Sequence, residues 1–238
     1  MSAHDATRRK SEPQSRRAGT ARGQGPSLAL WALMGGAVLV IVAGFLGLDR
    51  WFYEHVSLAL APRDRLGSGF YPVSKPLWLL CRRAFGYGVV PLAVLIGLVV
   101  LKPERGRQAV VGALAIIVAA LVANGAQAAI GRLRPNQGTT HLAFTQPFAE
   151  LLTKQNVSFP SGEAATAMAA AYVLGRLLPR WKAAFYVCST LAAVARLVNG
   201  AHYLSDVAAG ALLGSLLAAL VFRWAAPAAE RRKKSAGA

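Results

Sequence analysis

Apolar residues gather in six long runs along the chain, separated by shorter polar stretches. The runs cover about residues 27–48, 84–101, 108–130, 162–178, 183–198 and 204–225. A helix needs about 20 apolar residues to cross a bilayer, because each residue adds about 1.5 Å of length. The fourth and fifth runs reach that length only with their neighbouring residues. Backbone groups must pair internally in lipid, so the pattern predicts an all-α bundle of six transmembrane helices.

The composition supports a membrane protein. Of the 238 residues, 55% are hydrophobic and only 16% are charged, which is typical of polytopic membrane chains. Residues 1–26 show no apolar period, and we expect a flexible basic arm there. The first run is too long for a signal peptide and lacks a cleavage pattern, so we expect a membrane anchor. The predicted organisation is an arm (1–26), a membrane domain (27–225) and a basic tail (226–238).

The charge is strongly positive, with a formal net value of +17. Most basic residues lie in the tails and short loops, where they suit a cytoplasmic membrane face and attract anionic lipids. Aromatic residues do not alternate with them as a stacking surface requires, so we expect no nucleic-acid partner. With both termini inside, 17 Lys and Arg lie on the inner side and 10 on the outer side. This bias predicts cytoplasmic termini.

Three smaller features bear on how the helices pack. Residues 49–83 combine aromatic, Pro and basic residues, and we expect an amphipathic piece on the outer surface. Cys81 and Cys188 lie in or beside apolar runs without a pairing pattern, so we interpret them as small apolar residues. Gly210 and Gly214, together with the alanines of the fourth run, predict close helix packing.

Distinctive polar residues follow the third and fifth runs, whose connections share the outer side in this topology. His202 and Asp206 are four residues apart, so a helix would place the carboxylate beside the imidazole and orient it. Arg134 and Arg196 carry planar forks that match phosphate oxygens. Ser161 precedes a helix whose N-terminus favours an anion. Together these groups indicate a phosphoryl site with a His nucleophile in a cage of donors.

Each of these residues also has a simpler interpretation. A single Arg at a membrane interface can snorkel, the His202–Asp206 pair can be structural, and Ser161 can be only an N-cap. A metal site built from His202, Asp206, Glu163 and His141 is the alternative chemistry. The chain has no HExxH pattern or paired-Cys spacing, and two nearby arginines would repel a cation. We therefore expect no metal.

Three strings carry a resemblance to a known family. They are QAAIGRLRP (127–135), PSGE (160–163) and ARLVNGAHYLSD (195–206). Their order and spacing over about residues 84–225 resemble the type 2 phosphatidic acid phosphatase superfamily of membrane lipid phosphatases, whose pattern is K-x6-RP, PSGH and SR-x5-H-x3-D. The resemblance implies a six-span, metal-independent and cofactor-independent enzyme. Its site would open at the outer leaflet of a bacterial inner membrane, facing the periplasm.

The resemblance also implies roles for individual residues. His202 would attack phosphorus to form a phosphohistidine, and Asp206 would orient its ring. The phosphate would be held by the side chains of Arg134, Arg196 and Ser161 and the backbone N–H of Gly162. The substrate would be a lipid phosphomonoester or pyrophosphate. The alternatives are a phosphotransferase, or a non-catalytic protein of the same fold that binds anionic lipid headgroups. No sequence feature indicates an oligomeric state.

Three positions depart from the family pattern. Gln127 stands in place of the Lys at the phosphate, Ala195 replaces the Ser before Arg196, and Glu163 replaces the His after PSG. The family His donates a proton to the leaving alcohol, and we expect Glu163 to take this role, which requires a protonated carboxyl group near neutral pH. The alternative is a Glu that only complements the helix dipole. The two charge changes also disfavour a highly charged pyrophosphate.

Overall fold

The computed structural model describes residues 28–58, 76, 79–137, 140–149 and 156–225. The predicted arm and tail, and most of 59–78, lie outside the described residues. The helices are α1 (Leu28–Ala43), α2 (Asp49–Phe52), α5 (Val89–Leu101), α6 (Pro103–Ile130), α7 (Gly162–Leu177), α8 (Lys182–Val198) and α9 (Leu204–Ala225). Short helical turns are η1 (Gly44–Leu48), η2 (Tyr53–Ser57), η3 (Arg82–Gly86) and η4 (Pro179–Trp181). The predicted all-α fold is confirmed for this part of the chain.

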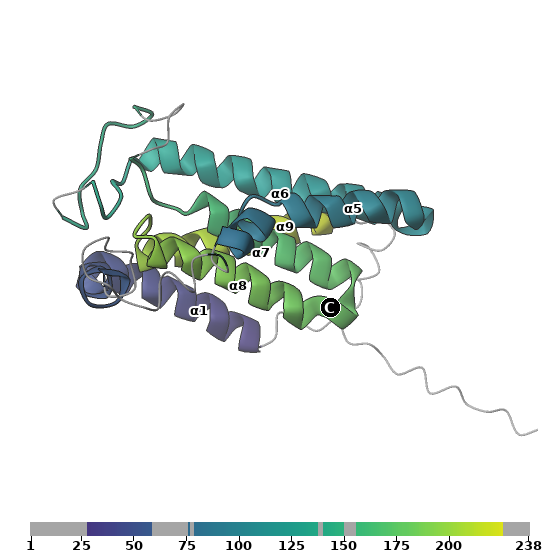
Figure 1. Cartoon of the computed structure of the whole chain (residues 1–238), viewed down its shortest axis with the longest axis horizontal. Coiled ribbons are helices and arrows are strands. Elements are labelled where there is room, and N and C mark those ends of the chain that lie inside the picture. Colours follow the sequence, from purple (N-terminus) through teal and green to yellow (C-terminus); the bar gives the residue numbers. More distant parts are fainter. Residues whose placement is uncertain (1–27, 59–75, 77–78, 138–139, 150–155, 226–238) are drawn as a thin grey trace, which may run out of the picture.

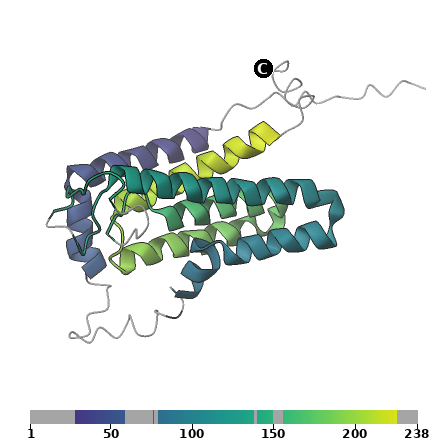
Figure 2. The same ribbon diagram turned by 90° about the horizontal axis from the view of Figure 1, so that it is seen from above.

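Helix α7 lies at the centre of the bundle and packs against α6, α8 and α9 (Figure 1). Twelve of its 16 residues are buried, and six of those are alanines. Small side chains let the surrounding helices approach closely, so α7 forms the core of the fold. Helix α1 packs against α9, and α5 packs against α6 (Figure 2).

Four helical stretches in the described residues are long and apolar enough to cross a membrane. They are Ala32–Ser57, Pro103–Ile130, Pro179–Val198 and Leu204–Ala225. A fifth span forms if Leu79–Gly86 and Val89–Leu101, bent by 45° at their junction, count together. The chain is thus a membrane protein with four or five candidate spans. Helix α7 is too short to count by length, and the predicted number of six is not confirmed.

The first span turns sharply at its end. Gly47 has a φ of 132°, a conformation open mainly to glycine, and from there α2 and η2 run across the end of the bundle (Figure 2). Asp49 and Ser57 on this segment are buried. One side of this segment is therefore buried, with the Asp49 carboxylate paired with an arginine inside the bundle, while Trp51 and Glu54 are exposed; its place on the outer membrane surface stays a prediction.

The two cysteines are free. Cys81 is buried in an apolar cluster with Phe85 and Ala167, and Cys188 packs against the same cluster. The interpretation of both as small apolar residues agrees with this packing.

Gly210 and Gly214 lie where α9 crosses α7, as the sequence predicts. A Cβ at Gly214 would overlap the Ala165 carbonyl, and one at Gly210 would overlap the Ser161 carbonyl.

Gly214→Ala should therefore lower the free energy of unfolding by about 1–3 kcal/mol, because the backbones of α7 and α9 must separate. Thermal unfolding in detergent measures this loss. The matched control is Gly125→Ala on α6, where an added Cβ would meet no neighbouring atom within 4 Å. Equal losses of stability in both variants would contradict the close contact between α7 and α9.

Candidate active site

The polar residues converge at one end of the bundle, where α6 and α8 end and α7 and α9 begin. The connection after α6 crosses this end and forms two isolated bridges, Arg132 with Phe144 and Leu133 with Val157. A pocket of about 380 Å³ opens beside it. Its lining residues are Gly86, Tyr87, Ala120, Asn124, Gln127, Arg134, Gly162, Glu163, Thr166, Arg196 and His202. Most of the predicted site residues therefore share one cavity.

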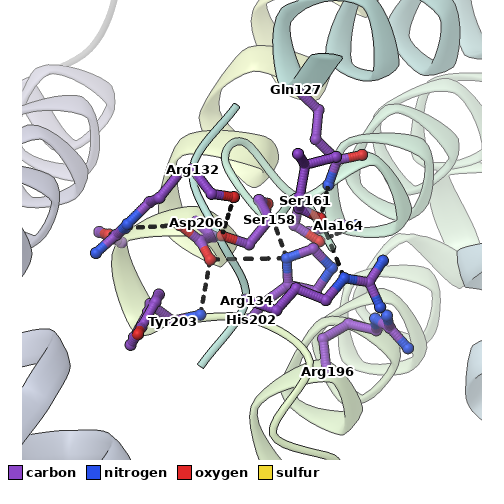
Figure 3. Close-up of polar contacts among 12 residues, drawn as sticks. Gln127, Arg132, Arg134, Ser158, Ser161, Ala164, Arg196, His202, Tyr203 and Asp206 are labelled. Carbon is purple, nitrogen blue, oxygen red and sulfur yellow. Dashed lines mark hydrogen bonds and ion pairs between the residues drawn. The ribbon is translucent and has the colours of Figure 1, made fainter. Parts of the chain in front are cut away.

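His202 is held by a backbone carbonyl. Its Nδ1 lies 2.9 Å from the carbonyl oxygen of Ser158 and 3.7 Å from Oδ2 of Asp206. Because a carbonyl oxygen only accepts, Nδ1 carries the proton and Nε2 keeps its lone pair. Figure 3 shows the ring between Asp206 on one side and the side chains of Arg134 and Arg196 on the other. This tautomer suits a nucleophile at Nε2.

The surroundings of His202 favour its neutral form. Burial lowers the pKa of the imidazole below its ordinary value, the nearby Asp206 carboxylate opposes this effect, and the positive charges of Arg196 and Arg134 add to it. A neutral ring is the form that can attack phosphorus. The site therefore favours a neutral imidazole at His202.

Asp206 is anchored more firmly to other groups than to His202. Its Oδ2 accepts a hydrogen bond from the backbone N–H of Tyr203 at 2.7 Å. Its Oδ1 accepts one from Nη1 of Arg132, also at 2.7 Å. Asp206 and Arg132 have no exposed side-chain surface. The carboxylate is thus fixed in place, with His202 within ion-pair distance.

Arg132 is the centre of a buried charge network that the sequence analysis did not identify. Its Nη2 donates to Oδ2 of Asp49 at 2.9 Å, and its Nη1 donates to Oγ of Ser205 at 2.7 Å. Nε and Nη2 both donate to the carbonyl oxygen of His141, at 3.0 and 2.7 Å. Ser205 in turn donates from its Oγ and backbone N–H to Asp49. The network ties the start of α2 to the start of α9.

Two aromatic rings enclose the same guanidinium. The Arg132 Cζ lies 4.4 Å from the ring centroid of Phe45 and 4.3 Å from that of Tyr203. Such cation–π contacts keep the group dry and flat between the rings. Arg132 therefore positions the segment that carries Asp206, although it does not line the pocket.

The two predicted phosphate arginines both line the pocket. Arg134 donates from Nε to the carbonyl oxygen of Val157 at 3.1 Å. Arg196 is 3% exposed, and among the described residues its Nε has no hydrogen-bond partner. A buried guanidinium nitrogen without such a partner is costly. Arg196 is therefore a strong candidate for binding an anion in the pocket.

The predicted groups at the start of α7 take different places. The Ser161 Oγ accepts from the backbone N–H of Ala164 at 3.4 Å, so Ser161 is the N-cap, and it does not line the pocket. Gly162 lines the pocket, and a Cβ there would meet Oδ1 of Asn124 at 2.7 Å.

Gln127, on α6, is 4% exposed and donates from Nε2 to the Val157 carbonyl oxygen at 3.2 Å.

Glu163 lies on the pocket wall as an ion-pair partner. Its two carboxylate oxygens accept hydrogen bonds from Nε and Nη2 of Arg82, at 2.8 and 3.0 Å. Nε of Arg196 lies 3.4 Å from Oε2. Two guanidinium groups stabilise the ionised carboxylate. The contacts of Glu163 are therefore those of a counter-ion, and Arg82 is a neighbour that the sequence patterns did not indicate.

The residues weighed as metal ligands are dispersed. In the part of the chain that the structure describes, no three His, Cys, Asp or Glu side chains gather as a metal site would require. His141, one of the four considered, makes a 3.2 Å hydrogen-bond contact from Nε2 to the carbonyl oxygen of Phe45. Metal independence stays a prediction.

Comparison with known proteins decides the family. The model described as PAP2 superfamily matches residues 108–229, which is half of the chain. The chain belongs to the PAP2 superfamily. This confirms the resemblance found in the three sequence strings, and the match includes the first, second and third of them.

The chain is also similar to two individual phosphatases. The chain is 38% identical over 111 residues to a lipid A 1-phosphatase from Rhizobium johnstonii, covering 45% of each. It therefore spans less than half of that relative's length. It is 33% identical over 134 residues to the decaprenylphosphoryl-5-phosphoribose phosphatase of Mycobacterium tuberculosis, covering 55% of this chain and 68% of the relative.

A solved PAP2 structure shares the fold. A transmembrane PAP2-type phosphatidylglycerolphosphate phosphatase from Bacillus subtilis superposes with a TM-score of 0.55 at 22% identity, covering 82% of this chain and 94% of that one. The helical bundle described above is thus a PAP2 fold.

Proposed function

We propose that this protein is a membrane lipid phosphatase that removes phosphate from a lipid phosphomonoester through a phosphohistidine at His202. The observation that carries the proposal is the state of His202. Its Nδ1 is committed to the Ser158 carbonyl oxygen, and the ring lines a pocket that also contains Arg134 and Arg196. The names of its relatives denote phosphatases, which supports the same reaction.

The reaction follows from these groups. Nε2 of His202 attacks phosphorus, the new P–N bond forms, and the bond from phosphorus to the lipid oxygen breaks. Asp206, 3.7 Å from Nδ1, stabilises the imidazolium charge that develops. Arg134 and Arg196 stabilise the negative charge on the phosphoryl oxygens. Water then attacks the phosphohistidine, releases inorganic phosphate and restores the neutral ring.

We infer that Glu163 is a counter-ion of the arginines and not the proton donor expected from the superfamily pattern. The bidentate contact with Arg82 supports this role, since an ionised carboxylate has no proton to give. The leaving oxygen then receives its proton from water. The neutral Gln127, in place of a Lys, supports a phosphomonoester in preference to the more highly charged pyrophosphate.

We further propose an outward-facing site with both termini in the cytoplasm. The excess of Lys and Arg on the inner side supports this orientation. The site lies at the end of the bundle where the connections after α6 and α8 meet (Figure 1), and these are the connections assigned to the outer side.

Phosphate release by purified protein from a panel of lipid phosphates, with a lipid pyrophosphate included, tests both the proposed reaction and the proposed substrate class.

The activity should fall at acid pH. The pKa of His202 is lowered in the folded protein, so the neutral nucleophile is present above that pKa and is lost only as the pH falls well below about 6.5, the ordinary value. Acid should also destabilise the folded protein, because the unfolded chain binds the His202 proton more readily. The imidazole signals in NMR spectra, assigned with His202→Gln, measure the midpoint directly. A midpoint at or above 6.5 would contradict the arrangement.

A further inference from the structure

Arg82 contacts a pocket residue, Glu163, from outside the three superfamily strings. It lies on η3, and the 45° bend between η3 and α5 directs this turn toward the start of α7. Gly86 and Tyr87, on the same segment, line the pocket. Gly86 also makes this approach possible, because a Cβ there would lie 3.3 Å from Oε2 of Glu163. The bent span therefore brings an additional arginine beside the pocket, in contact with Glu163, which lines it.

The guanidinium of Arg82 is already arranged as an oxyanion receptor. Its Nε and Nη2 hold both carboxylate oxygens of Glu163, and its Cζ lies 5.2 Å from the Tyr87 ring centroid. A phosphate presents two oxygens to such a fork in the same way as a carboxylate. Glu163 thus marks the place where a phosphate oxygen pair would fit.

The exchange of one oxyanion for the other is physically accessible. The side chains of Arg82 and Glu163 are 26% and 19% exposed, so neither ion needs to be left in a dry interior. A phosphate dianion also attracts a guanidinium more strongly than a singly charged carboxylate does. Glu163 lines the pocket together with Arg196, which lies within reach of the same carboxylate.

We propose that Arg82 is a third phosphate-binding arginine, which Glu163 holds at the pocket and then yields to the substrate phosphate. This inference rests on the proposed function of the same pocket. It explains how a site with a neutral Gln127 still collects enough positive charge for a phosphate dianion. It also gives the carboxylate of Glu163 a role in tuning affinity, because the carboxylate competes with the phosphate for one guanidinium.

Binding of orthovanadate, a phosphate analogue, tests the proposal on the purified full-length protein by calorimetry. Arg82→Ala should raise the Kd about tenfold or more, which is the effect of one lost charge-assisted hydrogen-bond pair. The matched control is Arg83→Ala, since Arg83 is exposed on the same turn and should change the Kd less than about twofold. Equal Kd values for Arg82→Ala and the wild type would overturn the proposal.

Two further variants separate binding from folding. Glu163→Gln should lower the Kd several-fold, because the competing carboxylate is gone, and a higher Kd would overturn the exchange. In the double variant Arg82→Gln/Glu163→Gln both members of the Arg82–Glu163 pair are neutral, and its Kd should still exceed that of Glu163→Gln alone. Equal values would also overturn the proposal. Failure of the wild type to release phosphate from any lipid would refute the proposed function, while vanadate affinity would still decide the role of Arg82.

Discussion

Arg132→Met should lower the free energy of unfolding by about 3–5 kcal/mol, because it removes one partner of a buried ion pair and leaves the others uncompensated. Arg132 is fully buried between Asp49 and Asp206, and its guanidinium carries the only positive charge in direct contact with either carboxylate among the described residues. Met keeps an unbranched stem close in size to that of Arg, so the loss reports mainly the guanidinium and its contacts. Unfolding in mixed micelles measures the change.

Three controls make this result specific. Arg132→Lys should also be strongly destabilised, since one ammonium cannot reproduce the fork that reaches Asp49, Ser205 and Asp206. Adding Asp49→Asn to Arg132→Met should recover part of the lost stability, because one of the two unpaired charges is gone. Arg134→Met, two residues away and half-buried, should change stability by less than about 1 kcal/mol. Equal losses for Arg132→Met and Arg134→Met would contradict the network.

His202→Gln should reduce turnover by at least about a thousandfold while the protein stays folded. The amide of Gln can still donate to the Ser158 carbonyl oxygen, but it has no nitrogen lone pair that attacks phosphorus. His141→Gln is the matched control, because His141 contacts Phe45 and does not line the pocket. Phosphate release at saturating substrate measures both variants. A His202→Gln protein with near wild-type turnover would exclude the proposed nucleophile.

The sequence patterns correctly predicted that several of the candidate site residues lie close together. Spacing in the third string placed His202 and Asp206 together, and both are found at the same end of the bundle with Arg134 and Arg196. Such patterns succeed because they record short-range geometry: residues four apart meet at a helix start. The apolar runs likewise predicted an all-helical fold, since apolar period and length determine helices in lipid.

The patterns missed the contacts that join distant segments. Arg132 binds Asp49 across 83 residues and Asp206 across 74 residues, and Arg82 binds Glu163 across 81 residues. No local spacing indicates such pairs. The Ser158 carbonyl that fixes the His202 tautomer is a backbone group, which every residue type supplies. Only the fold brings it to the ring.

The fourth apolar run shows a different limit. Its composition predicted a transmembrane helix, and α7 is surrounded by protein and has only 16 residues, so its crossing of the membrane stays a prediction. Burial against other helices requires the same apolar residues as burial in lipid. Composition therefore does not show whether a helix contacts lipid or other helices, and the burial of α7 comes from the fold.

Trapping the phosphohistidine intermediate tests the proposed mechanism most directly. Purified protein mixed with a lipid phosphomonoester carrying radioactive phosphate is quenched within milliseconds in alkali, where phosphohistidine survives. Label is expected on the peptide that contains His202, absent from His202→Gln and present in His141→Gln. Hydrolysis of the lipid with no label on that peptide, or with the label on another residue, would contradict it.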